Sequence, residues 1–97
     1  MSKTGYTYMM TNLYNTVIYT GVTSRLPQRV MEHKEQIHPK SFTAKYNCCK
    51  LVWYEGFENI EDAVLREKQI KGGCRADKET LINSMNPEWN DLFEQIM

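Results

Sequence analysis

An arginine and a histidine stand at helical positions where apolar side chains would be expected. In the stretch LPQRVMEHKEQ, Arg29 and His33 lie at spacings of three and four from apolar neighbours. A helix would therefore place them on the same stripe as Leu26 and Val30. Arginine can bind two phosphate oxygens, and histidine can gain or lose a proton near neutral pH. This stripe indicates a polar site rather than a purely apolar core.

A carboxylate takes a similar position in a second helical segment. Glu67 completes the apolar stripe of residues 60–71, where a leucine would be expected. Burying a charge without a partner is costly, so this position needs an explanation. One explanation is a half-buried ion pair between Glu67 and Arg29, with His33 bonded to a backbone carbonyl. The other is a shared site that acts on a ligand.

Two tyrosines are expected beside these residues. YTYMMT and VIYTGV favour β structure and NLYN supplies turn residues, so residues 6–22 predict an antiparallel hairpin. A simple register brings Tyr8 opposite Tyr19. Two phenols, an arginine, a histidine and one carboxylate together suit a phosphodiester and a single divalent metal.

Local signals predict the elements that must position these groups. The first helix is expected to be capped by Thr23 or Ser24 and to have Pro27 in its first turn. Residues 41–49, SFTAKYNCC, are predicted to be a loop. Residues 50–57, KLVWYEGF, are predicted to be a third strand because they are rich in aromatic and β-branched side chains.

The C-terminal half is predicted to be helical. Asn59 is expected to begin a helix that glycines end at residues 72–73, and Asp77 is expected to cap the next helix, KETLINSM. The pair Asn86–Pro87 predicts a last amphipathic helix that extends through Ile96. The predicted fold class is α/β, a small three-stranded antiparallel-type sheet flanked by helices.

Composition is that of one small globular domain over residues 1–97, with 41% hydrophobic residues. The first residues, MSKTGYTYMM, do not form a signal segment, and no stretch is long enough for a membrane span. We therefore expect a cytoplasmic protein. Three cysteines, an odd number, predict reduced thiols rather than a disulfide framework or a zinc site.

The formal net charge is zero, but it is unevenly distributed. Residues 1–50 contain seven Lys or Arg against two Glu, so they carry a net charge of +5 that the remainder balances. A basic face is therefore compatible with a neutral protein. The side chains expected to hold a nucleic-acid backbone or stack on an unpaired base are Arg25, Lys34, Lys40, Lys45 and Tyr46, with Phe42 beside them.

The ordered combination of these residues resembles the GIY-YIG nuclease superfamily, in particular its small stand-alone bacterial members. Tyr8, the YTG at residues 19–21, Arg29 and His33 look like the first part of its pattern, and EDAVLREKQIKG looks like its later glutamate-bearing helix. The resemblance covers nearly the whole chain. It implies a three-stranded sheet packed among helices, in agreement with the predicted elements.

The resemblance also implies a role for each site residue. Tyr8 and Tyr19 match the tyrosines of the two triplets, whose phenols position or deprotonate the attacking water. Arg29 matches the arginine that contacts the scissile phosphate, and His33 an auxiliary histidine that contacts phosphate or leaving group. Glu67 matches the ligand of one Mg²⁺ or Mn²⁺ ion. One carboxylate suffices because these hard cations keep several waters.

The implied function is a metal-dependent DNA endonuclease that hydrolyses phosphodiester bonds, in structured or damaged DNA as in DNA repair. No membrane and no small-molecule cofactor are expected. The alternative is a catalytically weak or silent module on the same fold that binds nucleic acid or a partner; a purely structural protein is a third. The sequence departs from the family at Tyr6 and Thr7, which replace a glycine and an isoleucine. The family's downstream asparagine stays unassigned between Asn83 and Asn86.

Overall fold

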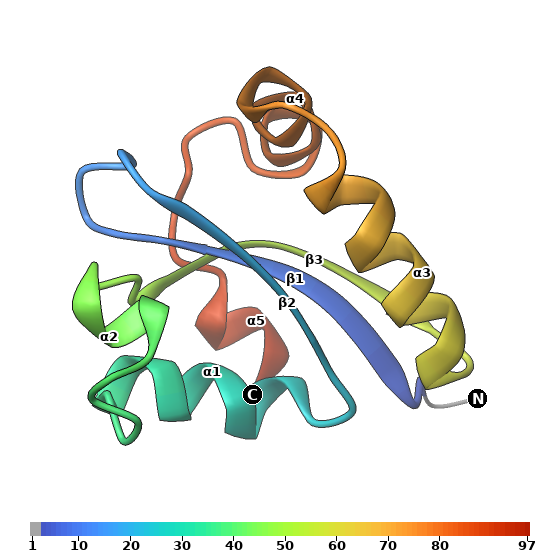
Figure 1. Cartoon of the computed structure of the whole chain (residues 1–97), viewed down its shortest axis with the longest axis horizontal. Helices are drawn as coiled ribbons and strands as arrows, with labels where there is room; N and C mark the ends of the chain where they lie inside the picture. Colours follow the sequence, from blue (N-terminus) through green and yellow to red (C-terminus); the bar gives the residue numbers. More distant parts are fainter. Residues whose placement is uncertain (1–2) are drawn as a thin grey trace.

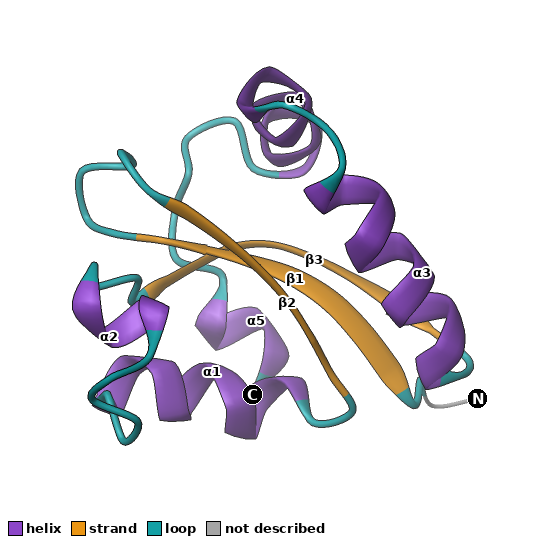
Figure 2. Ribbon diagram, in the orientation of Figure 1, coloured by secondary structure: helices purple, strands orange, loops and turns teal. Residues whose placement is uncertain are grey.

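The computed structural model describes residues 3–97 and places a three-stranded antiparallel sheet between two groups of helices (Figure 1). The strands are β1 (Gly5–Thr11), β2 (Ile18–Thr23) and β3 (Lys50–Phe57), with β1 in the centre. One side is covered by α1 (Leu26–Glu35), α2 (Phe42–Lys45) and α5 (Phe93–Ile96), and the other by α3 (Ile60–Lys71) and α4 (Arg75–Met85) (Figure 2). The predicted fold class is confirmed.

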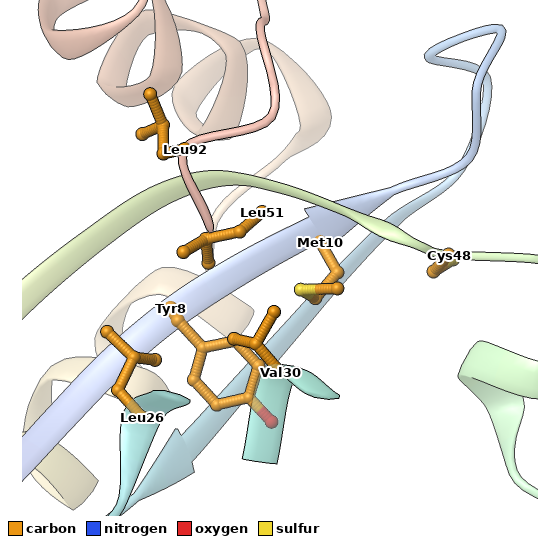
Figure 3. Packing of buried hydrophobic residues seen from close by; sticks show 7 residues of the cluster. All are labelled: Tyr8, Met10, Leu26, Val30, Cys48, Leu51 and Leu92. Carbon is orange, nitrogen blue, oxygen red and sulfur yellow. The ribbon is translucent and has the colours of Figure 1, made fainter. Parts of the chain in front are cut away.

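The central strand β1 is buried on both of its faces. Tyr8 and Met10 pack on one side with Leu26 and Val30 of α1, and Figure 3 shows the Tyr8 ring beside these two side chains. Met9 faces the opposite side and joins a second apolar cluster beneath α3 and α4. This double burial explains why the strand is apolar at consecutive positions.

The hairpin register differs from the predicted one by two residues. Tyr8 pairs with Gly21, and Tyr19 pairs with Met10, so the expectation that the two tyrosines are directly opposite was wrong. A shift of two residues keeps each side chain on its face, and the phenols remain diagonal neighbours with ring centroids 6.2 Å apart. Gly21 allows this register because its missing side chain leaves room for the Tyr8 ring.

Helix α1 begins at Leu26, so its cap position is Arg25 and not the predicted Thr23 or Ser24. The Thr23 hydroxyl instead accepts a hydrogen bond of 3.0 Å from the Arg25 N–H, which forms a local turn before the helix. Pro27 lies in the first turn as predicted.

Residues 41–49 are not entirely a loop, because they contain the short helix α2. The Ser41 hydroxyl accepts a hydrogen bond from the Ala44 N–H and so caps this helix. The turn buries Thr43, which is only 2% exposed. The sequence contained this signal in the serine that precedes FTAK.

Helix α3 has the predicted limits, with the Asn59 side chain capping its start and Gly72 at its end. Helix α4 begins at Arg75, two residues before the predicted cap. Asp77 therefore lies inside its first turn, where its carboxylate accepts a hydrogen bond from the Cys74 N–H. Asp77 was correctly identified as a residue near the start of a helix, but it is the third residue of the helix and not its cap.

The predicted last helix was wrong for residues 86–92, which are not helical; only α5 follows them. The buried Asn86 side chain donates to the Val52 carbonyl of β3 and to a carbonyl of its own turn. Further along, the Leu92 N–H donates to the Leu51 carbonyl at 2.7 Å. These long-range bonds hold the segment against β3 and prevent a continuous helix.

The thiols and the helix lengths can also be compared with the expectations from the sequence. Cys48, Cys49 and Cys74 are free thiols. Across residues 3–97, every helix is too short or too polar to cross a membrane.

Replacing Gly21 with alanine is expected to destabilise the protein by roughly 1–3 kcal/mol. The new Cβ would lie 2.6 Å from the Tyr8 hydroxyl oxygen and 2.8 Å from a Tyr19 ring carbon, so both rings would have to move. Urea unfolding measures the effect. Gly72→Ala is the matched control: its Cβ would meet nothing closer than 3.4 Å in a helical conformation, so stability should stay similar or rise. Equal stability of Gly21→Ala and the wild type would contradict this packing.

Candidate active site

Strand β1 and helix α1 bring Tyr8 and His33 into direct contact. The Tyr8 hydroxyl oxygen lies 2.7 Å from His33 Nε2, and the two side chains are 0% and 4% exposed. His33 Nδ1 lies 2.8 Å from the Thr43 hydroxyl of α2. A neutral imidazole has one donor and one acceptor nitrogen, so both ring nitrogens are satisfied. Thr43 was missed from the sequence because residues 41–49 were assigned to a loop.

Burial keeps both His33 and Tyr8 uncharged at neutral pH. It lowers the pKa of His33 to about 4, and the nearby Arg29 charge lowers it further. Burial also raises the pKa of Tyr8 above its usual range; Tyr19 adds to this effect and Arg29 partly offsets it. Tyr8 therefore keeps its proton and acts through hydrogen bonds rather than as a ready phenolate.

Tyr19 and Arg29 lie at the rim of this buried pair. Tyr19 is half-buried, and its ring centroid is 5.5 Å from that of His33 in an edge-to-face arrangement. Arg29 Nη1 lies 2.9 Å from a Glu32 carboxylate oxygen. Burial lowers the pKa of Arg29, but the Glu32 hydrogen bond and the two phenols outweigh this and raise it. Arg29 is thus a fixed cation next to both tyrosines.

Glu67 lies on α3, on the opposite side of the sheet from Tyr8 and His33. Arg66 reaches β3, where its Nε lies 2.9 Å from a Glu55 carboxylate oxygen. Glu67 pairs with Lys71, which lines a hollow with residues of β2, so Glu67 lies on the flank of α3 toward β2. Its side chain is 17% exposed, and its Oε2 lies 3.2 Å from Lys71 Nζ. The alternative ion pair between Glu67 and Arg29 is not formed, since each pairs on its own helix.

A hollow of about 310 Å³ at the edge of β2 connects the two sides of the sheet. We call it the edge hollow; it is lined by Ile18, Tyr19, Thr20, Phe42, Lys71 and Lys78. Tyr19 enters it from the α1 side, and Lys71, the ion-pair partner of Glu67, enters it from the α3 side. The expected shared site is therefore formed only in part: Tyr8, Tyr19, Arg29 and His33 adjoin. Glu67 lies across the sheet and does not line the hollow, although its partner Lys71 does.

Glu67 suits a hard divalent cation. Within residues 3–97 there is no group of three or more His, Cys, Asp or Glu side chains arranged to hold a metal. Mg²⁺ and Mn²⁺ prefer oxygen ligands, and Mg²⁺ in particular keeps several waters and often binds through one carboxylate together with substrate phosphate. A single carboxylate next to a cationic hollow that can admit phosphate fits this chemistry.

An aromatic row extends from the edge hollow over α2. The Phe42 ring centroid is 5.9 Å from Tyr19 and 4.7 Å from Tyr46, and Lys45 Nζ lies 5.4 Å from the Tyr46 ring centroid. Phe42 and Tyr46 are 46% and 40% exposed. Lys40 is exposed in the loop that precedes α2. These residues offer ring faces and positive charge to a ligand on the surface.

The other basic candidates have different surroundings. Arg25 is exposed at the start of α1, one turn from Arg29, and donates to Gln28. Lys34 is held at the other end of α1, where it donates to the Cys49 carbonyl at 2.9 Å and pairs with Asp91. Lys34 thus already has two partners within the protein.

Both asparagines left open by the sequence have structural partners. Asn86 is buried, and its side chain bonds to β3 and to its own turn, as described above. The Asn83 side-chain oxygen, Oδ1, accepts a hydrogen bond of 2.7 Å from the Trp89 indole N–H. Each of the two side chains therefore has a structural hydrogen-bond partner within the protein.

Comparison with known proteins agrees with this geometry. Residues 4–80 match the family described as the GIY-YIG catalytic domain. The chain belongs to this family. The match assigns the GIY-YIG domain described here a nuclease-type fold, and it confirms the resemblance seen in the sequence.

The GIY-YIG domain is also similar to proteins named UPF0213. It is 34% identical over 88 residues to one from Syntrophus aciditrophicus, covering 91% of this chain and 98% of that one. It is 39% identical over 79 residues to one from Clostridium perfringens, covering 81% and 84%. The solution NMR structure of a UPF0213 protein from Bacillus halodurans has the same fold, with a TM-score of 0.57, 23% identity and 90% coverage of both chains.

Acidification is expected to destabilise the protein through His33. Its pKa is about 4 in the folded state and near ~6.5 in an unfolded chain, so between these values the unfolded state binds more protons. Stability is therefore complete above pH ~6.5 and falls as pH drops toward 4, by about 2 kcal/mol between pH 7.5 and 5. Urea unfolding at several pH values measures this loss.

Two histidine variants separate this effect from general acid sensitivity. His33→Asn should remove most of the pH dependence above pH 5, whatever its effect on overall stability. His38→Asn, at an exposed position on the loop after α1, should retain it. An unchanged pH dependence in His33→Asn would mean that burial does not hold His33 neutral.

Proposed function

We propose that this GIY-YIG domain is a metal-dependent endonuclease that hydrolyses DNA phosphodiester bonds. The observation that carries the proposal is the cluster of Tyr8, Tyr19, Arg29 and His33 beside the edge of β2, with Glu67 on the facing flank of α3. Membership in a family whose domains are typically nucleases supports the same chemistry.

The two tyrosines take different roles. Tyr19 is half-buried and lines the edge hollow, whereas Tyr8 is fully buried, so we assign to Tyr19 the contact with an attacking water. Tyr8 is fully buried and protonated, and its hydroxyl is held by His33. Tyr8 and His33 therefore act as positioning residues, which hold Tyr19 in place next to the reacting atoms.

Arg29 is the residue that binds the scissile phosphate. Its guanidinium is partly exposed and oriented by Glu32, which leaves further N–H groups for phosphate oxygens. A fixed cation at this point stabilises the negative charge that develops as water attacks phosphorus. Its charge also lowers the pKa of the Tyr8 hydroxyl, although burial outweighs this effect.

Glu67 would hold one Mg²⁺ or Mn²⁺ ion. Such an ion supplies Lewis-acid stabilisation of the phosphate and the leaving oxygen when bound. Glu67 meets the requirement for a charged oxygen ligand close to the hollow, and Lys71 balances its charge within the protein.

The substrate is best matched by DNA with unpaired bases, in structured or damaged duplexes. Phe42 and Tyr46 expose ring faces on which bases can stack, and Lys45, Lys40 and Arg25 add charge for the backbone. A cytoplasmic site of action accords with such a substrate.

Glu67→Gln is expected to lower metal-dependent cleavage by at least about 100-fold, because the amide keeps the shape but loses the charge that holds the cation. Stability should change by no more than about 0.5 kcal/mol, since the lost Glu67–Lys71 pair is a partly exposed pair within one helix. Cleavage of plasmid, branched and single-stranded DNA in Mg²⁺ or Mn²⁺, against EDTA, is compared with urea unfolding of the same proteins.

Glu61→Gln serves as the control, because Glu61 is an exposed carboxylate on the same helix. It should cleave as the wild type does. A wild type that binds DNA but cleaves none of the three substrates in either metal would instead identify a catalytically silent binding module. A loss of several kcal/mol of stability in Glu67→Gln would assign Glu67 a structural role.

A further inference from the structure

We propose that the edge hollow is a second phosphate subsite, which binds the backbone phosphate next to the one that is cleaved. This inference deepens the proposed function, since it names the part of the substrate that this hollow would take. It rests on three features of the hollow: its charge, an unpaired hydroxyl and an aromatic wall.

The charge of the edge hollow comes from two lysines on different helices. Lys71 extends from α3 and Lys78 from α4, and both line the hollow. Lys78 forms no ion pair within residues 3–97, and none of the described side chains that line the hollow is acidic. Lys71 is paired with Glu67 but is about half exposed, so its flexible side chain can turn toward an anion. Two ammonium groups around one hollow favour a phosphate there.

The unpaired hydroxyl belongs to Thr20, in the strand between Tyr19 and Gly21. Thr20 is 4% exposed, and its Oγ1 is the one buried side-chain oxygen or nitrogen in residues 3–97 without a hydrogen-bond partner. Buried hydroxyls are nearly always bonded, because leaving one unsatisfied is costly. Thr20 lines the edge hollow, but its Oγ1 is closed to water, so the flexible side chains around it must shift before a phosphate oxygen can accept its hydrogen bond.

The aromatic wall indicates a nucleotide rather than an isolated ion. Tyr19 and Phe42 line the hollow opposite the lysines, with ring centroids 5.9 Å apart. They offer an apolar surface to the sugar or base attached to the phosphate. Tyr19 also belongs to the Arg29 cluster, so a strand held by Arg29 at one phosphate passes Tyr19 before it reaches Lys71 and Lys78.

Salt dependence of DNA binding tests the lysines. We expect the Lys71→Gln/Lys78→Gln variant to lose about 1.4 units of the slope of log K against log salt for a single strand, and about 1.8 for a duplex. The measurement is the anisotropy of a fluorescein-labelled 12-nucleotide strand and its duplex, in EDTA, so that it does not depend on metal or cleavage.

A control variant removes the same net charge elsewhere. Lys68 is exposed on α3 and Lys3 is exposed before β1, and neither lines the edge hollow. Lys3→Gln/Lys68→Gln should keep the wild-type slope. The proposal would be overturned if the Lys71→Gln/Lys78→Gln variant also kept the wild-type slope. It would be overturned as well if both double variants lost the same amount of slope.

Thr20→Val tests the hydroxyl, because valine keeps the shape and removes the unpaired oxygen. Single-strand affinity should fall about threefold to tenfold while the midpoint of thermal unfolding stays the same or rises. Unchanged affinity would overturn the role of Thr20, whatever the midpoint of unfolding. If the Lys71→Gln/Lys78→Gln variant loses salt dependence but the wild type cleaves no DNA, the subsite is supported and the nuclease is rejected. If the wild type cleaves normally and the salt dependence of the double variant is unchanged, only the subsite is rejected.

Discussion

The close contact between the Tyr8 ring and the backbone of Gly21 determines where the other polar groups of the site can lie. A Cβ at Gly21 would come within 2.6 Å of the Tyr8 hydroxyl, so only glycine allows this ring to lie across the strand. The ring then extends between Leu26 and Val30 (Figure 3). Its hydroxyl oxygen lies 2.7 Å from His33 Nε2. Each further contact, from His33 to Thr43 and α2, follows from this placement.

The second constraint is that the candidate site is built around an edge strand. β2 has a neighbour on one side only, so groups from both faces of the sheet can meet at its free edge. Tyr19 comes from one face, whereas Glu67 and Lys71 come from a helix on the other. A central strand would separate these groups completely. The edge therefore brings a tyrosine from one face of the sheet and lysines from helices on the other to the same hollow.

Features with a local signal could be predicted from the sequence. The strand at residues 50–57 and the helix between Asn59 and Gly72 depend on short-range propensity and caps, and both were correct. The stripe of α1 likewise predicted that Arg29 and His33 share the inward face with Leu26 and Val30; the structure buries His33 and leaves Arg29 half-buried. These assignments succeeded because the fold agrees with each local preference.

Features that depend on distant contacts could not be predicted in the same way. The hairpin register depends on the turn conformation and on the Tyr8–Gly21 contact. Asn86 followed by a proline has the pattern of a helix cap, yet its side chain bonds to Val52 of β3, and this long-range bond prevails over the local signal. Thr43 and Thr20 have no signal of their own, since their importance arises only from what the fold places beside them.

Burial also decides which polar groups of the site carry charge. The interior holds Tyr8, His33 and Thr43, whose hydrogen bonds are satisfied without ionisation. The cations Arg29 and Lys71 remain at the rim, where water and a carboxylate partner solvate each of them. Since a carboxylate is paired with each of them, the positive charge beyond these pairs comes from residues such as Lys78, which forms no ion pair within residues 3–97. Attraction for a polyanion then depends on where these few cations lie and not on net charge.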